Sequence, residues 1–387
     1  MGKLNESVNF IRELYATNAE IHLHEPQFSG NEKRYLNDVV DSTFVSSVGE
    51  YIGKFEDLVC SYTKSSAAVA TVNGTSAIHV ALHAAGIGAG DLVVTQSFSF
   101  VATCNAIRMT GADPIFVDIN REGLGLCSKS LEAFLEKKAW INDLGECRLR
   151  DDGRRIRAVV PMHTFGHPVQ IDEIIEICNR WNLILVEDAS ESLGSFYKGK
   201  HTGTFGLFGA LSFNGNKIVT TGGGGMVLCN DTKSGKRIKH LTTTAKVPHP
   251  FEYFHDEFGF NYRMPNVNAA LGCAQLEKLH FYLEAKRNLA IRYRDFYSGS
   301  DFAFLDEPVH ANSNFWLNAV ICADKKLRDE FLSITNREGI STRPVWMPLH
   351  KLPMYKDCIR GNLSVTEFME ERVVNLPSTP RLESQDA

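Results

Sequence analysis

The sequence predicts an α/β fold with a largely parallel sheet whose two faces are covered by helices. Strand-like and helix-like segments alternate through the middle of the chain, and the strand-like runs are short and almost wholly apolar. This alternation is typical of parallel strands joined by crossover helices. It stops near residue 250, where long helical segments begin. We therefore expect a second, smaller unit of α+β type.

Periodicity and flanking residues predict the elements in order. Near the start of the chain, Leu4, Val8, Ile11 and Tyr15 recur at helical spacing and predict an amphipathic helix. Further helices are predicted over 76–90, 100–112 and 170–182. Strands are predicted over 91–96, 113–119, 157–166 (with its loop), 183–190 and 209–215.

Two segments do not follow the alternating pattern. Residues 135–157 are polar and predict a surface excursion with a turn at Asp152-Gly153. Residues 264–299 predict long helices. We expect a large α/β domain over 1–250 and a small C-terminal domain over 251–387, with the N-terminal segment free to pack on the small domain.

Composition excludes several classes of protein. The 387 residues are 43% apolar and 22% charged, with a formal net charge of -5 and no basic block. We expect neither a nucleic-acid partner nor a membrane, because the longest apolar runs are far too short to span a bilayer. The amino end lacks a signal-peptide pattern, and nine cysteines occur without any C-x-x-C pair. These features favour free thiols in the cytoplasm over disulfides or zinc, and no metal site is expected.

Gly74-Thr75-Ser76 stands directly before a predicted helix. The unpaired amides and the dipole of a helix N-terminus bind phosphate well. The simpler interpretation is an ordinary N-cap, and the tripeptide alone favours that interpretation.

Asp188 closes the apolar strand in "LILVEDAS". An acid at the carboxyl end of a strand lies at the ligand-binding edge of an α/β sheet. Such an acid can bind a metal, act as a base or pair with a protonated ring nitrogen. Capping of the next helix explains it equally well.

Lys217 stands between a strand and four glycines in "SFNGNKIVTTGGGGM". A phosphate loop reads G-x-x-x-x-G-K-[ST], so the order of residues here excludes that motif. An exposed loop lysine is the commoner case. The functional alternative is a partly buried amine of lowered pKa that forms a Schiff base with a carbonyl.

Together these features are the parts that pyridoxal 5'-phosphate requires: a phosphate site, a partner for the ring nitrogen and an amine. The chain also resembles the DegT/DnrJ/EryC1/StrS family of nucleotide-sugar aminotransferases over nearly its whole length. The resemblance rests on "NGTSAIHVAL", "FVATCNAI", "VEDASESLGS", "SFNGNK", "NYRMPNVNAALGCAQLEKL" and "NLPSTPRL". It implies a fold-type-I, aspartate aminotransferase-like transferase with a mostly parallel seven-stranded sheet, an obligate homodimer and a ping-pong reaction with L-glutamate.

The resemblance also implies residue roles. Lys217 should form the Schiff base with pyridoxal phosphate, and Asp188 should keep the pyridine nitrogen protonated. The remaining cofactor contacts are expected from the following residues: Gly74, Thr75, Ser76 and Ser212 at the phosphate, Phe100 stacked on the ring, Glu191 near the 3'-oxygen, and Asn261 reaching the phosphate from the partner subunit.

Two departures from the family pattern point to a subgroup. Glu191 stands where the family often has Gln or His, and Gly223 where it often has Glu. With "HEPQFSGNE" and "FVSSVGEY", they resemble the LegC-type enzymes that aminate a nucleotide-linked 4-keto-6-deoxy-N-acetylhexose toward legionaminic acid.

The alternatives are a relative acting on another keto sugar, of perosamine or 3-amino-sugar type, and a non-catalytic sugar-nucleotide-binding regulator. A sugar dehydratase of the same fold would have histidine at the position of Lys217. A dinucleotide oxidoreductase would need a glycine motif that "GIGAGD" supplies only in part.

Overall fold

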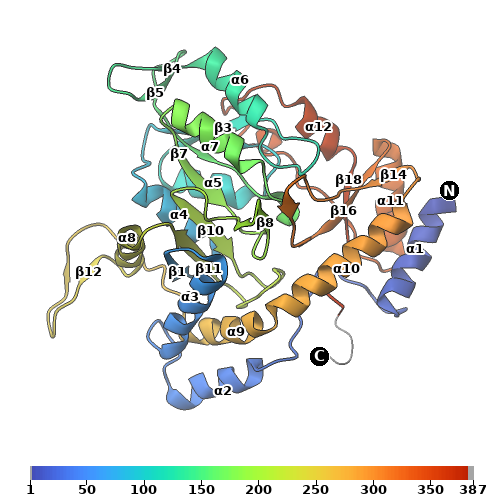
Figure 1. Ribbon diagram of the computed structural model, residues 1–387, viewed down its shortest axis with the longest axis horizontal. Coiled ribbons are helices and arrows are strands. Elements are labelled where there is room, and N and C mark those ends of the chain that lie inside the picture. The colour runs from blue at the N-terminus through green and yellow to red at the C-terminus, as the bar shows by residue number, and fades with distance from the viewer. Residues whose placement is uncertain (1, 382–387) are drawn as a thin grey trace.

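A central seven-stranded sheet organises the molecule, which we describe for residues 2–381 of a computed structural model (Figure 1). Only one strand, β11, runs against the others. The mostly parallel α/β sheet expected from the sequence is therefore confirmed. In spatial order the strands are β1 (Ala67–Thr71), β11 (Gly225–Cys229), β10 (Phe208–Ser212), β7 (Ile184–Asp188), β6 (Ile156–Val160), β2 (Leu92–Gln96) and β3 (Asp113–Val117).

Helices bury both faces of this sheet, as its continuous apolar strands require. Successive strand residues, such as Val69 and Ala70, belong to apolar cores on opposite faces of the sheet. One face is covered by α4 (Gly74–Ala84), α5 (Val101–Met109) and α8 (Thr232–Thr242). The other is covered by α2 (Glu32–Ser42), α3 (Glu50–Thr63), α6 (Ser128–Lys138), α7 (Ile171–Arg180) and α9 (Asn266–Glu277).

A second, antiparallel sheet of four strands forms late in the chain, in the order β14 (Phe302–Phe304), β16 (Asn318–Cys322), β18 (Val373–Leu376) and β17 (Arg343–Pro344). It shares an apolar core with α10 (Leu279–Tyr297), α11 (Lys325–Arg337) and the first helix, α1 (Gly2–Tyr15). Helix α12 (Ser364–Glu370) leads into β18. The division into domains at residue 250 stays a prediction. Helix α9 comes after that boundary in the chain, yet it packs with α2 and α3, which come before it.

The remaining elements are short. Residues 135–157 contain the end of α6 and a hairpin, so the polar stretch is more regular than the sequence predicts. Another hairpin projects from the body beside α8 as an arm (Figure 1). These elements are β4 (Ala139–Ile141) with β5 (Cys147–Leu149), β8 (Phe196–Tyr197) with β9 (Lys200–His201) and β15 (Ala311–Asn312), the arm strands β12 (Lys246–Val247) and β13 (Phe254–His255), and the 3-10 turns η1 (Thr164–Gly166) and η2 (Leu349–Lys351).

Candidate active site

A cavity of about 370 Å³ opens beyond the carboxyl ends of the parallel strands. Strand β7 ends at Asp188 and β10 at Ser212, and both residues line the cavity. This edge is where ligands bind in α/β sheets, because the loops that follow parallel strands meet there. The lining residues are Asn73, Gly74, Thr75, Ile78, Phe100, Ala102, Thr103, Met162, Asp188, Ser190, Glu191, Ser212, Asn214, Asn216, Lys217, Gly224, Trp316 and Trp346.

One end of the cavity is a cup of hydrogen-bond donors at the N-terminus of α4. Asn73 caps the helix by accepting the amide of Ser76 at 2.8 Å. The cup itself consists of the amides of Gly74 and Thr75 and the hydroxyls of Thr75, Ser190 and Ser212, none of which has a hydrogen-bond partner within residues 2–381. A helix N-terminus with free donors is a site for an anion.

Gly74 allows the parts of this cup to come close together. A Cβ added at Gly74 would lie 2.9 Å from Cβ of Ser212 and 3.4 Å from Oγ of Ser190. Contacts at 2.9 Å do not occur between real side-chain carbons, so any larger residue would push Ser212 away. The helix start and β10 can therefore converge on one anion only with glycine at this position.

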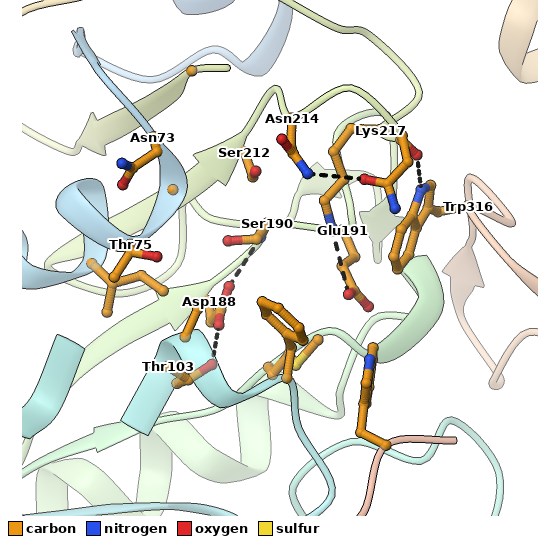
Figure 2. Close-up of a pocket in the computed structure, with 18 residues that line it drawn as sticks. Asn73, Thr75, Thr103, Asp188, Ser190, Glu191, Ser212, Asn214, Lys217 and Trp316 are labelled. Carbon is orange, nitrogen blue, oxygen red and sulfur yellow. Dashed lines mark hydrogen bonds and ion pairs between the residues drawn. The ribbon is translucent and has the colours of Figure 1, made fainter. Parts of the chain in front are cut away.

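Asp188 lies deeper in the cavity and is held by two donors (Figure 2). The Thr103 hydroxyl donates to Oδ2 at 2.6 Å, and the amide of Ser190 donates to Oδ1 at 3.1 Å. Both bonds hold the carboxylate in one orientation. Asp188 therefore presents a fixed carboxylate near the middle of the site.

The other end of the cavity holds Lys217. Its Nζ lies 3.5 Å from Oε1 of Glu191 and 3.7 Å from the centre of the Trp316 ring (Figure 2). Burial lowers the pKa of the Lys217 amine, whereas the Glu191 and Asp188 carboxylates raise it. The net shift is downward, so a larger share of this lysine is the neutral, nucleophilic amine than in solution.

The predicted site residues fall into two groups. Gly74, Thr75, Phe100, Asp188, Glu191, Ser212 and Lys217 all line the one cavity. Ser76 contributes its amide to the N-cap, but its side chain is not part of the lining. Asn261 is exposed near the base of the arm, where it accepts from Nε of Arg263 at 3.0 Å, and it lies outside the cavity of its own chain. The catalytic and cofactor roles of these residues stay predictions.

Sequence reasoning missed several lining residues. Thr103 and Ser190 hold Asp188, and Trp316 donates from Nε1 to the carbonyl of Asn216 at 2.8 Å. Ser190 stands two residues after Asp188 in the sequence, and this short spacing could have predicted that it lines the same site. Trp316 comes from about a hundred residues beyond Lys217, and no local pattern marks it.

Other conspicuous side chains lie outside the cavity. His163 is fully buried and contacts Glu187 at 3.0 Å, which makes it a packed histidine. Within residues 2–381, His240, Asp256 and Glu257 form the one group with metal-ligand spacing, but Arg237 already pairs with Glu257.

The nine cysteines are free. No described helix is long and apolar enough to cross a membrane.

The residues present fit pyridoxal phosphate. The cup supplies donors for a phosphate, Asp188 supplies the carboxylate for a ring nitrogen, and Lys217 supplies the amine. When bound, this cofactor supplies an electron sink for negative charge that develops on a substrate carbon. Fold and site together define the class: an α/β transferase of the pyridoxal phosphate-dependent kind.

The family is shown directly. Residues 26–387 match the DegT/DnrJ/EryC1/StrS aminotransferase family, and the chain belongs to it. It is therefore a pyridoxal phosphate-dependent aminotransferase.

Named relatives cover almost the whole chain. The GDP-perosamine synthase of Escherichia coli O157:H7 is 35% identical and aligns over 94% of this chain and 95% of its own. The GDP-perosamine synthase of Vibrio cholerae is also 35% identical, with the same two shares. Among solved structures, a DegT DnrJ EryC1 StrS aminotransferase from Brucella abortus is 26% identical and superposes with a TM-score of 0.83, covering 92% of each chain.

Proposed function

We propose that this aminotransferase places an amino group on the keto carbon of a nucleotide-linked 4-keto-6-deoxyhexose, with L-glutamate as the donor. The observation that carries the proposal is a single cavity that joins a phosphate cup, a fixed carboxylate and a lysine of lowered pKa. The perosamine synthases, by their names, support a nucleotide-linked sugar as the substrate.

In this proposal each residue has one task. The cup at α4 holds the phosphate of the cofactor, and Asp188 keeps a proton on the ring nitrogen. Lys217 would hold the cofactor through its amine. Once freed, its Nζ would take a proton from the substrate carbon as general base and give it up again as general acid. The same residues run the reverse sequence for the sugar.

Two versions of the sugar substrate remain. The sequence resemblance favours an N-acetylated sugar on the route to legionaminic acid, as in the LegC-type enzymes. The perosamine synthases favour a GDP-linked sugar of the perosamine type, and their identity over almost the whole chain supports this second version. The lining side chains of Asn214, Trp316 and Trp346 are the groups we expect to read the difference.

The experiment is an assay with UDP- and GDP-linked 4-keto-6-deoxy sugars, with and without the N-acetyl group, and L-glutamate as donor. Turnover of the GDP-linked, unacetylated sugar alone supports the perosamine version, and turnover of the acetylated sugar alone supports the LegC version. Failure of every keto sugar, in a preparation with full cofactor content, would refute the substrate class.

We also propose that the protein is a homodimer with active sites shared across the interface. The arm that follows α8 exposes Phe251 and Tyr253 with 79% and 82% of their surface free, and Phe258 is exposed beside it. Clusters of exposed aromatic residues are typical of surfaces that bind another protein. Asn261 lies near the base of the arm, in a position to serve a second chain rather than its own cavity.

The dimer is tested by light scattering on the purified protein and on a variant with Phe251 and Tyr253 both changed to Ser. We expect a dimer that dissociates in the variant. Asn261→Ala should stay dimeric and bind pyridoxal phosphate more weakly. A monomeric wild type with full activity would refute the shared site.

A further inference from the structure

Glu191 is a buried carboxylate whose two oxygens have different partners. Its side chain is 2% exposed, and Oε1 lies 3.5 Å from Nζ of Lys217. Oε2 accepts the amide of Phe165 at 2.9 Å. One oxygen thus faces the lysine (Figure 2), while the other is anchored to the backbone. A buried carboxylate without partners would be strongly disfavoured. The two partners of Glu191 therefore stabilise its side chain at this depth.

The loop that anchors Glu191 has a costly backbone. Phe165 has a φ of 56°, in the left-handed region, and Gly166 follows with a φ of 94°. Non-glycine residues are disfavoured in this region, because their Cβ approaches the carbonyl oxygen that follows. A Cβ at Gly166 would lie 1.8 Å from Oδ1 of Asn314, whose amide donates to the carbonyls of Glu191 and Leu193 at 2.9 Å each. The strained turn therefore directs the Phe165 amide at Glu191, and Asn314 locks both segments together.

The groups around Glu191 and Lys217 have opposing effects on the pKa of the Glu191 carboxyl. Burial raises the pKa of the Glu191 carboxyl and the Lys217 ammonium lowers it, while Asp188 raises it further. His24 is close enough for the charge of Lys217 to act on it: its pKa is lowered by burial and then by Lys286 and Lys217, so it stays neutral. Glu191 and Asp188 are thus the two carboxylates that act on the lysine nitrogen, and Glu191 is the one in contact with it.

We propose, building on the proposed role of Lys217, that Glu191 is the positioning residue that sets the charge of the lysine nitrogen. One proton is shared between Oε1 and Nζ: when the O–H bond breaks an N–H bond forms, and no electrons are exchanged. An ionised Glu191 stabilises a positive Nζ, and a protonated Glu191 leaves Nζ neutral. Glu191 therefore controls when this nitrogen is a base.

Glutamine at position 191 separates charge from shape. A Gln side chain has nearly the same volume and keeps an oxygen for the Phe165 amide, but it carries no charge. The matched control is Glu307→Gln, because Glu307 is also partly buried and paired with a cation, Arg287, outside the cavity. A purely structural role for Glu191 would not move a titration of Nζ.

The test is a pH titration of the visible absorbance band of the holoenzyme, which reports the protonation of the lysine nitrogen bound to the cofactor. We expect the midpoint to fall by about one pH unit or more in Glu191→Gln, since a positive nitrogen loses its nearest carboxylate. Glu191→Asp keeps the charge at a greater distance and should shift the midpoint less. Glu307→Gln should titrate like the wild type.

The outcomes separate this role from the function it rests on. A midpoint in Glu191→Gln equal to that of the wild type, with the band intact, overturns the role of Glu191 alone. A wild-type holoenzyme without any lysine-dependent band overturns the proposed function and this role with it. If Glu191→Gln does not fold, Glu191→Asp decides, and an unshifted midpoint in that variant refutes the role.

Discussion

The two ends of the cavity are built in opposite ways. At the N-terminus of α4, neutral donors converge: backbone amides and the hydroxyls of Thr75, Ser190 and Ser212. At the other end, two ionisable groups, Lys217 and Glu191, meet with Trp316 beside them. Neutral dipoles bind an anion without needing a counter-ion of their own. Buried charges must be paired, and pairing makes the state of one depend on the other.

We therefore predict that the first end binds the cofactor and that the second end carries the chemistry. Substitutions at the charged end should therefore change rates more than affinity, and substitutions in the cup should change affinity more than rates.

The largest effect is expected for Lys217→Ala. Removal of the proposed base should lower turnover by about 100-fold or more. The cup is intact, so pyridoxal phosphate should still bind, although without a covalent bond. Turnover assays and equilibrium dialysis measure the two effects. Activity within tenfold of the wild type would show that the charged end does not carry the chemistry.

Asp188→Asn should have the next largest effect, a fall in turnover of about 100-fold, because a neutral amide cannot hold a proton on the ring nitrogen by charge. The Thr103 hydroxyl can still bond the Asn side chain, so the fold should persist. Asp231→Asn, which changes the N-cap of α8, is the control outside the cavity. Equal effects of the two variants on turnover would contradict the assignment of Asp188.

Ser190→Ala and Ser212→Ala probe the cup. A hydrogen bond to a charged group contributes about 1.5–3 kcal/mol, so each variant should raise the dissociation constant of pyridoxal phosphate by roughly tenfold or more. Turnover at saturating cofactor should change little. Ser234→Ala in α8 is the matched control. A loss of turnover that added cofactor does not restore would contradict the prediction that the cup affects affinity rather than rate.

The smallest expected effect is on how the free energy of unfolding depends on pH, and it involves His201, which does not line the cavity. Burial lowers the pKa of His201 to about 4, and its Nε2 accepts the Gly194 amide at 2.9 Å, which a proton would displace. The unfolded chain therefore binds more protons than the native state between about pH 6.5 and 4, and stability falls with falling pH through that window. The loss is on the order of 1–3 kcal/mol. Urea unfolding should show a shallower fall in His201→Asn.

Much of the fold was predictable because the signals are local. The apolar run that became β7 is followed by Asp188, and the residues before α4 carry a helix-start pattern. The site was predictable only where family motifs mark it, as at Lys217 and Asp188. The partnership of Glu191 with Phe165 depends on a left-handed turn at Phe165 that no propensity predicts, since that conformation is disfavoured for phenylalanine.

The sequence by itself determined the α/β order of the elements, the family and the residue types that the cofactor chemistry needs. Those properties follow from short-range patterns: apolar periodicity, glycine positions and motifs a few residues long. Only the tertiary structure decided which side chains share the cavity, that Trp316 stands beside Lys217, and that Glu191 pairs with its amine. Burial and charge pairing depend on segments that are separated along the chain, and they exist only once the chain has folded.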